Sequence, residues 1–211
     1  MGLMSIVFIL IALVLSITLH EFAHAYVGAY LGDETARRQG RLTLNPLAHI
    51  DPLMTVLLPL FLILAHSPVI FGAARPVPFN PWAVRYGKWG VVLVALAGPA
   101  TNLFIAVFLA LWLRFFNLPP VAVNLLVTII VVNVAFFIFN LIPFPPLDGS
   151  RLLYAVAPLG LRSVMDRIER MGIILFALLL FVLFPLISPL IARLSGELLQ
   201  ILVPGLTGLS T

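Results

Sequence analysis

The residues with the clearest chemical potential form an HExxH pattern at positions 20–24, with His20, Glu21 and His24 as its fixed members. On a helix, positions i and i+4 lie on one face, so both imidazoles can reach one metal ion. The glutamate can reach a water molecule beside that metal. Such a short pattern also arises by chance. This one follows an uncharged apolar run, residues 2–19, and ionisable groups at membrane depth are rare and usually functional. A water-activating zinc site is therefore the favoured interpretation.

The composition is typical of a membrane protein. Of 211 residues, 62% are hydrophobic and 9% are charged, against roughly 45–50% and about 25% in soluble domains. The formal net charge of +4 is modest, and in a membrane protein it reports the orientation of loops, so we expect no nucleic-acid partner. The chain has no cysteine, so a metal site must use His, Asp and Glu. A cleavable signal peptide is not expected, because the N-terminus lacks a basic region.

The elements that would position the HExxH pattern follow from the apolar runs, since a spanning helix needs about 20 apolar residues. The first run extends from about Leu3 to Leu31 and carries the pattern in its second half. The run at 52–65 is short for a span and contains two prolines, which suits a re-entrant segment. The remaining runs cover residues 89–116, 121–142, 171–184 and 186–203, the last two being separated by Pro185 and Pro189.

These runs predict an all-α polytopic membrane protein with five to six transmembrane helices. A re-entrant or extended membrane-embedded segment is expected between the first and third runs. We interpret residues 1–211 as a single membrane-embedded domain, with a catalytic core at about 3–155 and a C-terminal helical hairpin at about 171–203.

Prolines and arginines indicate the course of the chain between the runs. Four prolines between residues 68 and 81 forbid a regular helix, and Val77 and Phe79 alternate with them as in an edge strand. Basic residues crowd positions 37–41, 75–88 and 151–170. If segment 52–66 enters the membrane without crossing it, all three regions lie on the cytoplasmic side. In either case the HExxH pattern lies toward the cytoplasmic end of its helix. The arginines at 37, 38 and 41 are expected to hold their loop at anionic headgroups, and the alternative is that they line the mouth of a water path to the metal.

Catalytic zinc typically takes three protein ligands and a water molecule, so a third ligand is needed. Asp148 is the favoured candidate, because it lies at a proline-rich break after the 121–142 run, at the same end of the bundle as the histidines. Unwound backbone at membrane depth is tolerated only inside protein or beside a water-filled cavity. The alternative is that Asp148 caps a helix over residues 150–157.

Other ionisable residues compete for the third position. Asp33 and Glu34 follow past the end of the HExxH helix, about 14 Å away. His49 and Asp51 are the strongest competitors, although their turn-rich loop can satisfy its own polar groups. The remaining candidates have arginines nearby and are expected to form ion pairs; they are Asp166, Glu169 and Glu197.

Three separated motifs resemble the site-2 protease family (peptidase family M50), which are zinc intramembrane proteases. The motifs are the HExxH pattern, Gly98-Pro99-Ala100-Thr101-Asn102, and Asn140-xx-Pro143-xxxx-Asp148-Gly149, and the resemblance covers roughly residues 15–155. It implies that His20, His24 and Asp148 bind one Zn²⁺ ion and that Glu21 is the catalytic acid and base. It also implies that Asn140 holds the substrate backbone or the oxyanion, and that Asn102 has a structural or substrate-positioning part. The chain differs in having Ser150 where the family often has a second glycine.

The expected function is that of a zinc-dependent intramembrane endopeptidase, which hydrolyses peptide bonds in or near transmembrane helices of membrane-protein substrates. We expect an integral protein of a prokaryotic cell (inner) membrane, with the active site toward the cytoplasmic face. The alternative is a non-enzymatic metal-binding membrane protein, such as a metal transporter or sensor, because intramembrane His and Asp clusters also mark ion pathways. The polar groups here converge on one point, which favours the protease.

Overall fold

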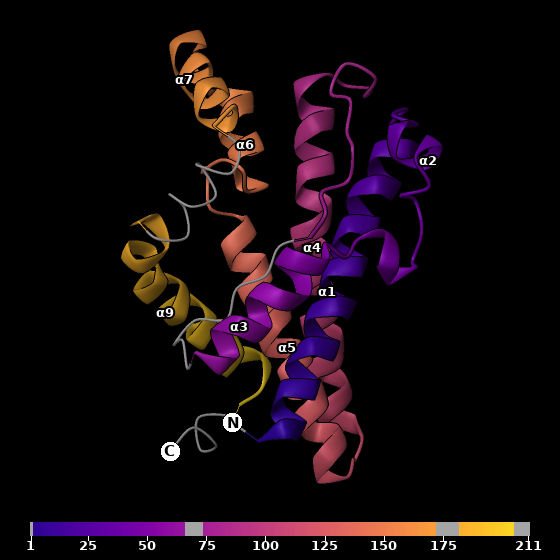
Figure 1. The fold of residues 1–211 in the computed structure, drawn as a ribbon, viewed down its shortest axis with the longest axis vertical. Helices are drawn as coiled ribbons and strands as arrows, with labels where there is room; N and C mark the ends of the chain where they lie inside the picture. The colour runs from indigo at the N-terminus through magenta and orange to yellow at the C-terminus, as the bar shows by residue number, and fades with distance from the viewer. Residues whose placement is uncertain (1, 66–73, 172–181, 205–211) are drawn as a thin grey trace.

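The computed structural model describes residues 2–65, 74–171 and 182–204 (Figure 1). Within these ranges the chain is helical and contains no β-strand, which confirms the all-α expectation. Three helices are long and apolar enough to cross a membrane: α1 (Leu3–Tyr30), α4 (Lys88–Phe115) and α5 (Pro120–Asn140). Their bounds agree with three of the expected runs to within two residues.

The long helices begin and end at residues that interrupt helical geometry. Gly32, with φ of 112°, follows the end of α1, since this backbone conformation favours glycine. Pro120 occupies the first turn of α5, where a missing N–H costs nothing. Pro99 lies inside α4, which continues through it.

The three long helices pack against one another in pairs. Small residues allow close approach between membrane helices, and here Ala106 and Ala110 of α4 face Ile130 and Val134 of α5 in a buried cluster. Leucines of α9 (Phe184–Leu202) pack against the same cluster. Figure 1 shows α9 beside α5.

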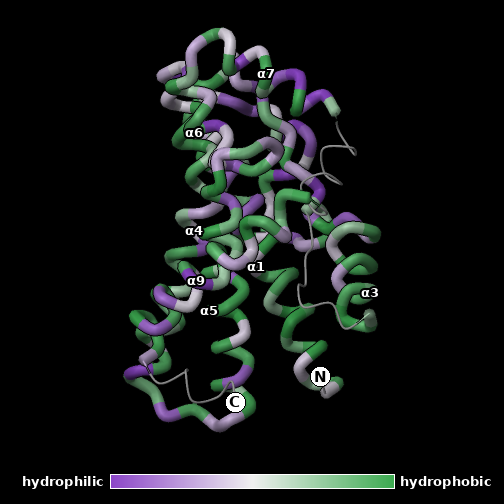
Figure 2. Tube along the Cα trace, turned by 90° about the vertical axis from the view of Figure 1, so that its left-hand side faces the viewer, coloured by the Kyte–Doolittle hydropathy of each residue, from purple (hydrophilic) through white to green (hydrophobic). Residues whose placement is uncertain are grey.

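Shorter elements cover the ends and one flank of this bundle. Between α1 and α4 lie α2 (Thr35–Arg38), η1 (Pro46–Ala48), η2 (Pro52–Leu57) and α3 (Leu58–Leu64), followed by non-helical residues 74–80. After α5 come α6 (Gly149–Val156) and α7 (Leu159–Glu169). Figure 2 shows that hydrophilic residues gather at the α7 end, whereas the opposite half of the long helices is mostly hydrophobic.

Only part of the expected C-terminal hairpin, residues 171–203, lies within the described residues. Most of its first limb, residues 172–181, lies outside the described residues. The second limb is α9, which begins at Phe184 and passes through Pro189 without interruption. The expectation of a break at Pro189 is therefore wrong, whereas Pro185 lies in the first turn of α9, where proline is tolerated.

Candidate metal centre

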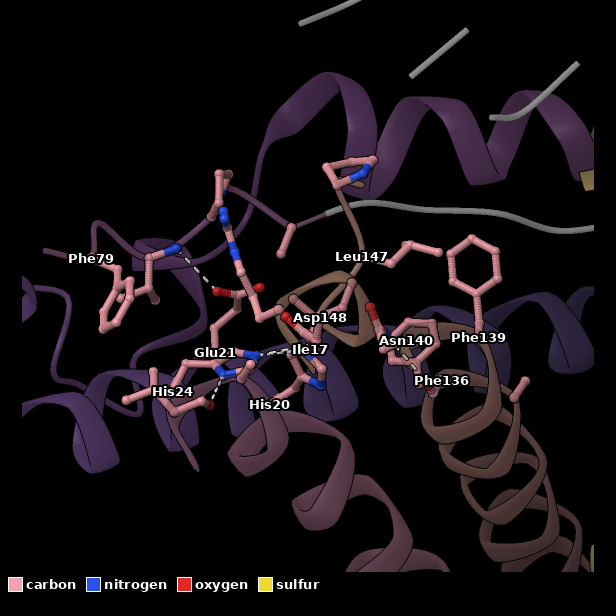
Figure 3. A pocket seen from close by; sticks show the side chains of 18 of the residues that line it. Ile17, His20, Glu21, His24, Phe79, Phe136, Phe139, Asn140, Leu147 and Asp148 are labelled. Carbon is pink, nitrogen blue, oxygen red and sulfur yellow. Dashed lines mark hydrogen bonds and ion pairs between the residues drawn. The ribbon is translucent and has the colours of Figure 1, made fainter. Parts of the chain in front are cut away.

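His20, His24 and Asp148 converge on one point (Figure 3). The Nε2 atoms of the two histidines are 3.0 Å apart. Oδ2 of Asp148 lies 3.2 Å from each of them. The three atoms thus form a nearly equilateral triangle, although Asp148 follows the histidines by more than 120 residues.

The size of this triangle fits a zinc ion. With zinc–ligand bonds of about 2.0 Å, two ligand atoms of a regular tetrahedral site lie about 3.3 Å apart. The observed separations are 3.0–3.2 Å, so one ion can contact all three atoms. Two imidazoles and a carboxylate are hard-to-borderline ligands suited to zinc, and three protein ligands leave a fourth position for water or substrate.

Both imidazoles are oriented by partners at their other nitrogen. Nδ1 of His24 donates a hydrogen bond to the carbonyl oxygen of Val94 on α4, at 2.7 Å. Nδ1 of His20 donates to Oδ1 of Asn102, also on α4, at 2.6 Å. A proton on Nδ1 leaves the Nε2 lone pair directed at the centre of the triangle, as metal-ligating histidines require.

A buried polar chain continues behind His20. Asn102 is fully buried and donates to Oδ1 of Asn133 on α5, at 2.8 Å. Asn133 donates in turn to Oγ of Ser16 on α1, also at 2.8 Å. The chain therefore ties the three long helices together at the level of the site. Asn102 thus has a structural part, which was one of the two alternatives that the sequence left open.

Gly98 allows α4 to approach the two imidazoles. A Cβ atom at this position would lie 2.6 Å from Nε2 of His20 and closer still to Nε2 of His24. Because no carbon atom can occupy that space, only glycine leaves room for a metal ion and its ligands beside α4. Small residues let membrane helices pack closely, and here Gly98 lets α4 lie directly beside the two imidazoles.

Asp148 reaches the site from the turns that follow α5. It occupies the N-cap position of α6, but its side chain makes no capping hydrogen bond. The carboxylate instead contacts both histidines, which contradicts the alternative of a simple helix cap. An aspartate carboxylate in this position can bind a cation together with the two imidazoles.

Glu21 lines the same cavity as the three metal-binding side chains and is held by a backbone hydrogen bond. Its Oε2 accepts a hydrogen bond from the backbone N–H of Val77, at 3.1 Å. Val77 belongs to the non-helical, proline-rich residues 74–80. Figure 3 shows Phe79 of this segment on one side of the histidines and Asn140 on the other.

A cavity of about 1120 Å³ surrounds the triangle. Its walls come mainly from α1, α4, α5 and α9, from residues 74–79 and from residues 146–148. Its lining is largely apolar, with the ionisable groups gathered at the centre, which is the usual form of a ligand site. Asn140 lines this cavity, and its Nδ2 donates to the carbonyl oxygen of Phe136 at 3.1 Å.

The competing residues have other partners. Asp33 accepts the backbone N–H of Asn80 at 2.7 Å. The ring of His49 donates to the carbonyl oxygen of Thr43, and Asp51 accepts two N–H groups at the start of η2. Glu197 pairs with Arg193 at 2.9 Å, as expected. Glu169 of α7 also forms an ion pair, but with Arg151 of α6 and not with one of the arginines next to it in the sequence.

The sequence-based account did not anticipate the parts played by Asn133, Ser16 and Arg41. Polar side chains inside apolar helices are a signal that could have found the first two, since such groups seek partners on neighbouring helices. Arg41 was expected to lie at lipid headgroups with Arg37 and Arg38. It is instead buried, and its guanidinium donates to backbone carbonyls of the 74–80 segment.

Comparisons with known proteins agree with this geometry. A family model described as Peptidase family M50 matches residues 119–183. A relative from Bacillus subtilis (strain 168) is 38% identical over 196 residues, which cover 86% of each chain. The chain belongs to peptidase family M50. Family M50 membership confirms the resemblance found in the sequence, and together with the His–His–Asp cluster it confirms zinc as the expected metal.

The relatives carry the name "Putative zinc metalloprotease", followed by YwhC for the B. subtilis protein and by Rip2 for a protein of Mycobacterium tuberculosis and one of Mycolicibacterium smegmatis. The latter is 36% identical over 137 residues, which are 64% of this chain and 51% of that protein. The Rip2 protein of Mycobacterium tuberculosis is 34% identical over 146 residues, or 52% of its length. No solved structure is significantly similar to the chain.

Proposed function

We propose that this family M50 protein is a zinc-dependent intramembrane endopeptidase that hydrolyses peptide bonds in or near transmembrane helices. The observation that carries the proposal is the triangle of His20, His24 and Asp148 in a cavity that also contains Glu21. The membership of a peptidase family and the names of the relatives support a zinc metalloprotease. The three apolar helices support an integral membrane protein.

The proposed roles follow from the chemistry of each side chain. His20, His24 and Asp148 would hold one zinc ion, which when bound would supply a Lewis acid able to lower the pKa of water toward about 7 and to polarise the scissile carbonyl. Glu21 takes a proton from the attacking water and passes it to the leaving amine. Asn140, at the end of α5 on the cavity wall, donates to or accepts from the substrate backbone near the reacting carbonyl.

A helical substrate hides its amide bonds in i→i−4 hydrogen bonds and must unwind before attack. The extended residues 74–80 offer a surface for the unwound segment. Val77 directs its N–H toward Glu21, and along a strand the N–H and C=O groups of alternate residues share one edge. The edge formed by Val77 and Phe79 therefore faces the site, and we propose that the substrate pairs with it as an added strand.

The arrangement of α1 and α4 supports the proposed topology. The backbone N–H of Arg85, just before α4, donates to the carbonyl oxygen of Leu31, just after α1, at 2.9 Å. The chain between them thus starts and ends at the same end of the bundle, which favours a re-entrant rather than a spanning 52–66 segment. With the arginines of that end on the cytoplasmic side, the active site lies toward the cytoplasmic face of a prokaryotic inner membrane. We propose that residues 1–211 act as one membrane-embedded domain.

The test uses purified protein in lipid nanodiscs, with a model transmembrane peptide and zinc, beside the Glu21→Gln variant. We expect wild-type protein to bind one zinc ion and to cleave the peptide. The variant should retain zinc and lose about 10²- to 10⁴-fold in rate, the contribution typical of a general base. If zinc binding and ion flux persist in both proteins without cleavage, the metal transporter would replace the protease.

A further inference from the structure

One peptide group links Arg41 to Glu21. Nη2 of Arg41 donates to the carbonyl oxygen of Pro76 at 3.1 Å. The N–H on the other side of the same peptide bond belongs to Val77, and it donates to Oε2 of Glu21 at 3.1 Å. Because C=O and N–H point in opposite directions across a trans peptide, a cation and a carboxylate hold the two ends of one rigid unit.

Arg41 is buried where it makes this contact. Only 8% of the residue is exposed, whereas Arg37 and Arg38 in the preceding helix are exposed. The same Nη2 also donates to the carbonyl oxygen of Arg75, at 2.6 Å. A buried guanidinium stays charged and is costly to desolvate, so its hydrogen bonds to carbonyl oxygens are needed to hold it.

The rest of the segment is fixed at both ends by neutral or anionic groups. The N–H of Arg75 donates to the carbonyl oxygen of His49 at 2.9 Å, and the N–H of Asn80 donates to Asp33. Among the described residues, Arg41 is the one cation that donates to the carbonyl oxygen of the Pro76–Val77 peptide. Arg41 therefore influences the N–H group of Val77, which donates to Glu21. The contacts of Arg75 with His49 and of Asn80 with Asp33 only fix the position of the segment.

We propose that Arg41 is a positioning residue for Glu21, acting through the Pro76–Val77 peptide. The proposal rests on the proposed role of Glu21 as the proton acceptor. A positive charge on the carbonyl side polarises the peptide and strengthens the hydrogen bond that its N–H donates. The carboxylate of Glu21 is thereby held in one orientation.

The experiment compares wild type, R41Q, R41K and R37Q in nanodiscs, with zinc content, KM and kcat measured for one transmembrane peptide. R41Q should keep its zinc and its KM but lose about 10- to 100-fold in kcat, the effect of removing a charge-assisted hydrogen bond. R41K keeps a charged donor and should recover part of kcat. R37Q removes an exposed arginine that pairs with Glu34, and it should behave as wild type.

Hydrogen exchange is a second measurement, which reports directly on the Pro76–Val77 peptide group. Between residues 76 and 80 only Val77, Phe79 and Asn80 carry a backbone N–H, because positions 76 and 78 are proline. Hydrogen exchange in this stretch should be faster in R41Q than in wild type and in R37Q, while exchange in α1 and α4 is unchanged.

The outcomes separate this inference from the proposed function. Wild-type kcat and exchange in R41Q, or an equal loss in R37Q, would overturn the role of Arg41 and leave the protease intact. Loss of zinc from both R41Q and R41K would also overturn it, since Arg41 would then support the metal site as a whole. If R41Q alone loses zinc, a reduced kcat in zinc-loaded R41K supports the role, and an unchanged kcat overturns it. Zinc-loaded wild type that cleaves no peptide overturns both proposals.

Discussion

Nδ1 of His20 donates a hydrogen bond to the side-chain oxygen of Asn102 over 2.6 Å, although 82 residues separate the two. The contact joins the helix that carries the HExxH pattern to the helix that carries Gly98-Pro99. It also fixes which nitrogen of His20 faces the metal site.

Replacing Asn102 by alanine should weaken zinc binding by about 10- to 100-fold, as is typical for partners that orient a metal ligand. The reason is that His20 loses its acceptor and Asn133 loses a donor in the buried chain. Competition with a chelator of known affinity measures the change. Asn124→Ala is the matched control, since Asn124 lies on the exposed side of α5. Equal zinc affinity in both variants would refute the role of Asn102.

Gly98→Ala should remove zinc binding, because its Cβ would enter the space beside both Nε2 atoms. The clash is with side chains that α1 and α4 hold firmly, so relief would require the helices to separate. Zinc content and thermal unfolding are the measurements. Gly160→Ala is the control, since a Cβ there meets no atom within 4 Å and alanine favours a helix by roughly 0.5–1 kcal/mol. A zinc-loaded Gly98→Ala protein would contradict the observed close approach.

Asp148→Asn should reduce zinc affinity more strongly than Asn102→Ala, because it replaces an anionic ligand by a neutral one. Asp51→Asn is the informative comparison. Asp51 is the strongest competing carboxylate, but it accepts N–H groups at the start of η2, a task that asparagine performs equally well. Zinc content should therefore be unchanged in Asp51→Asn. Loss of zinc there, with zinc retained in Asp148→Asn, would reverse the assignment of the third ligand.

Phe79→Pro should impair cleavage while sparing zinc, because it removes an N–H group from the edge that we propose for substrate pairing. Phe79 also packs against a small apolar cluster near Leu31 and Val94, so Phe79→Leu controls for lost packing. A higher KM is expected for proline and not for leucine. Similar turnover by all three proteins would exclude strand pairing at this residue.

Val77→Pro is a less specific test than the sequence alone indicates. The N–H of Val77 donates to Glu21, so proline there would disturb the catalytic carboxylate as well as the edge. Its activity is expected to fall further than that of Phe79→Pro, in kcat rather than in KM.

The sequence by itself determined the long helices and the histidine pair. Hydrophobic runs report helices directly, and the i, i+4 spacing places His20 and His24 on one face. Asp148 could be nominated as well, because charged residues are scarce in this chain and proline breaks the helix before it. The motifs also identified the family, which the comparisons confirm.

Only the tertiary structure decided what surrounds these groups. The contact of Asn102 with His20, the space left by Gly98 and the peptide shared by Arg41 and Glu21 all join segments that are far apart in the chain. A local pattern shows which face of a helix is apolar, but it does not show which faces meet or which carbonyl a buried arginine reaches. Those relationships depend on how the helices pack, and packing is a property of the whole chain.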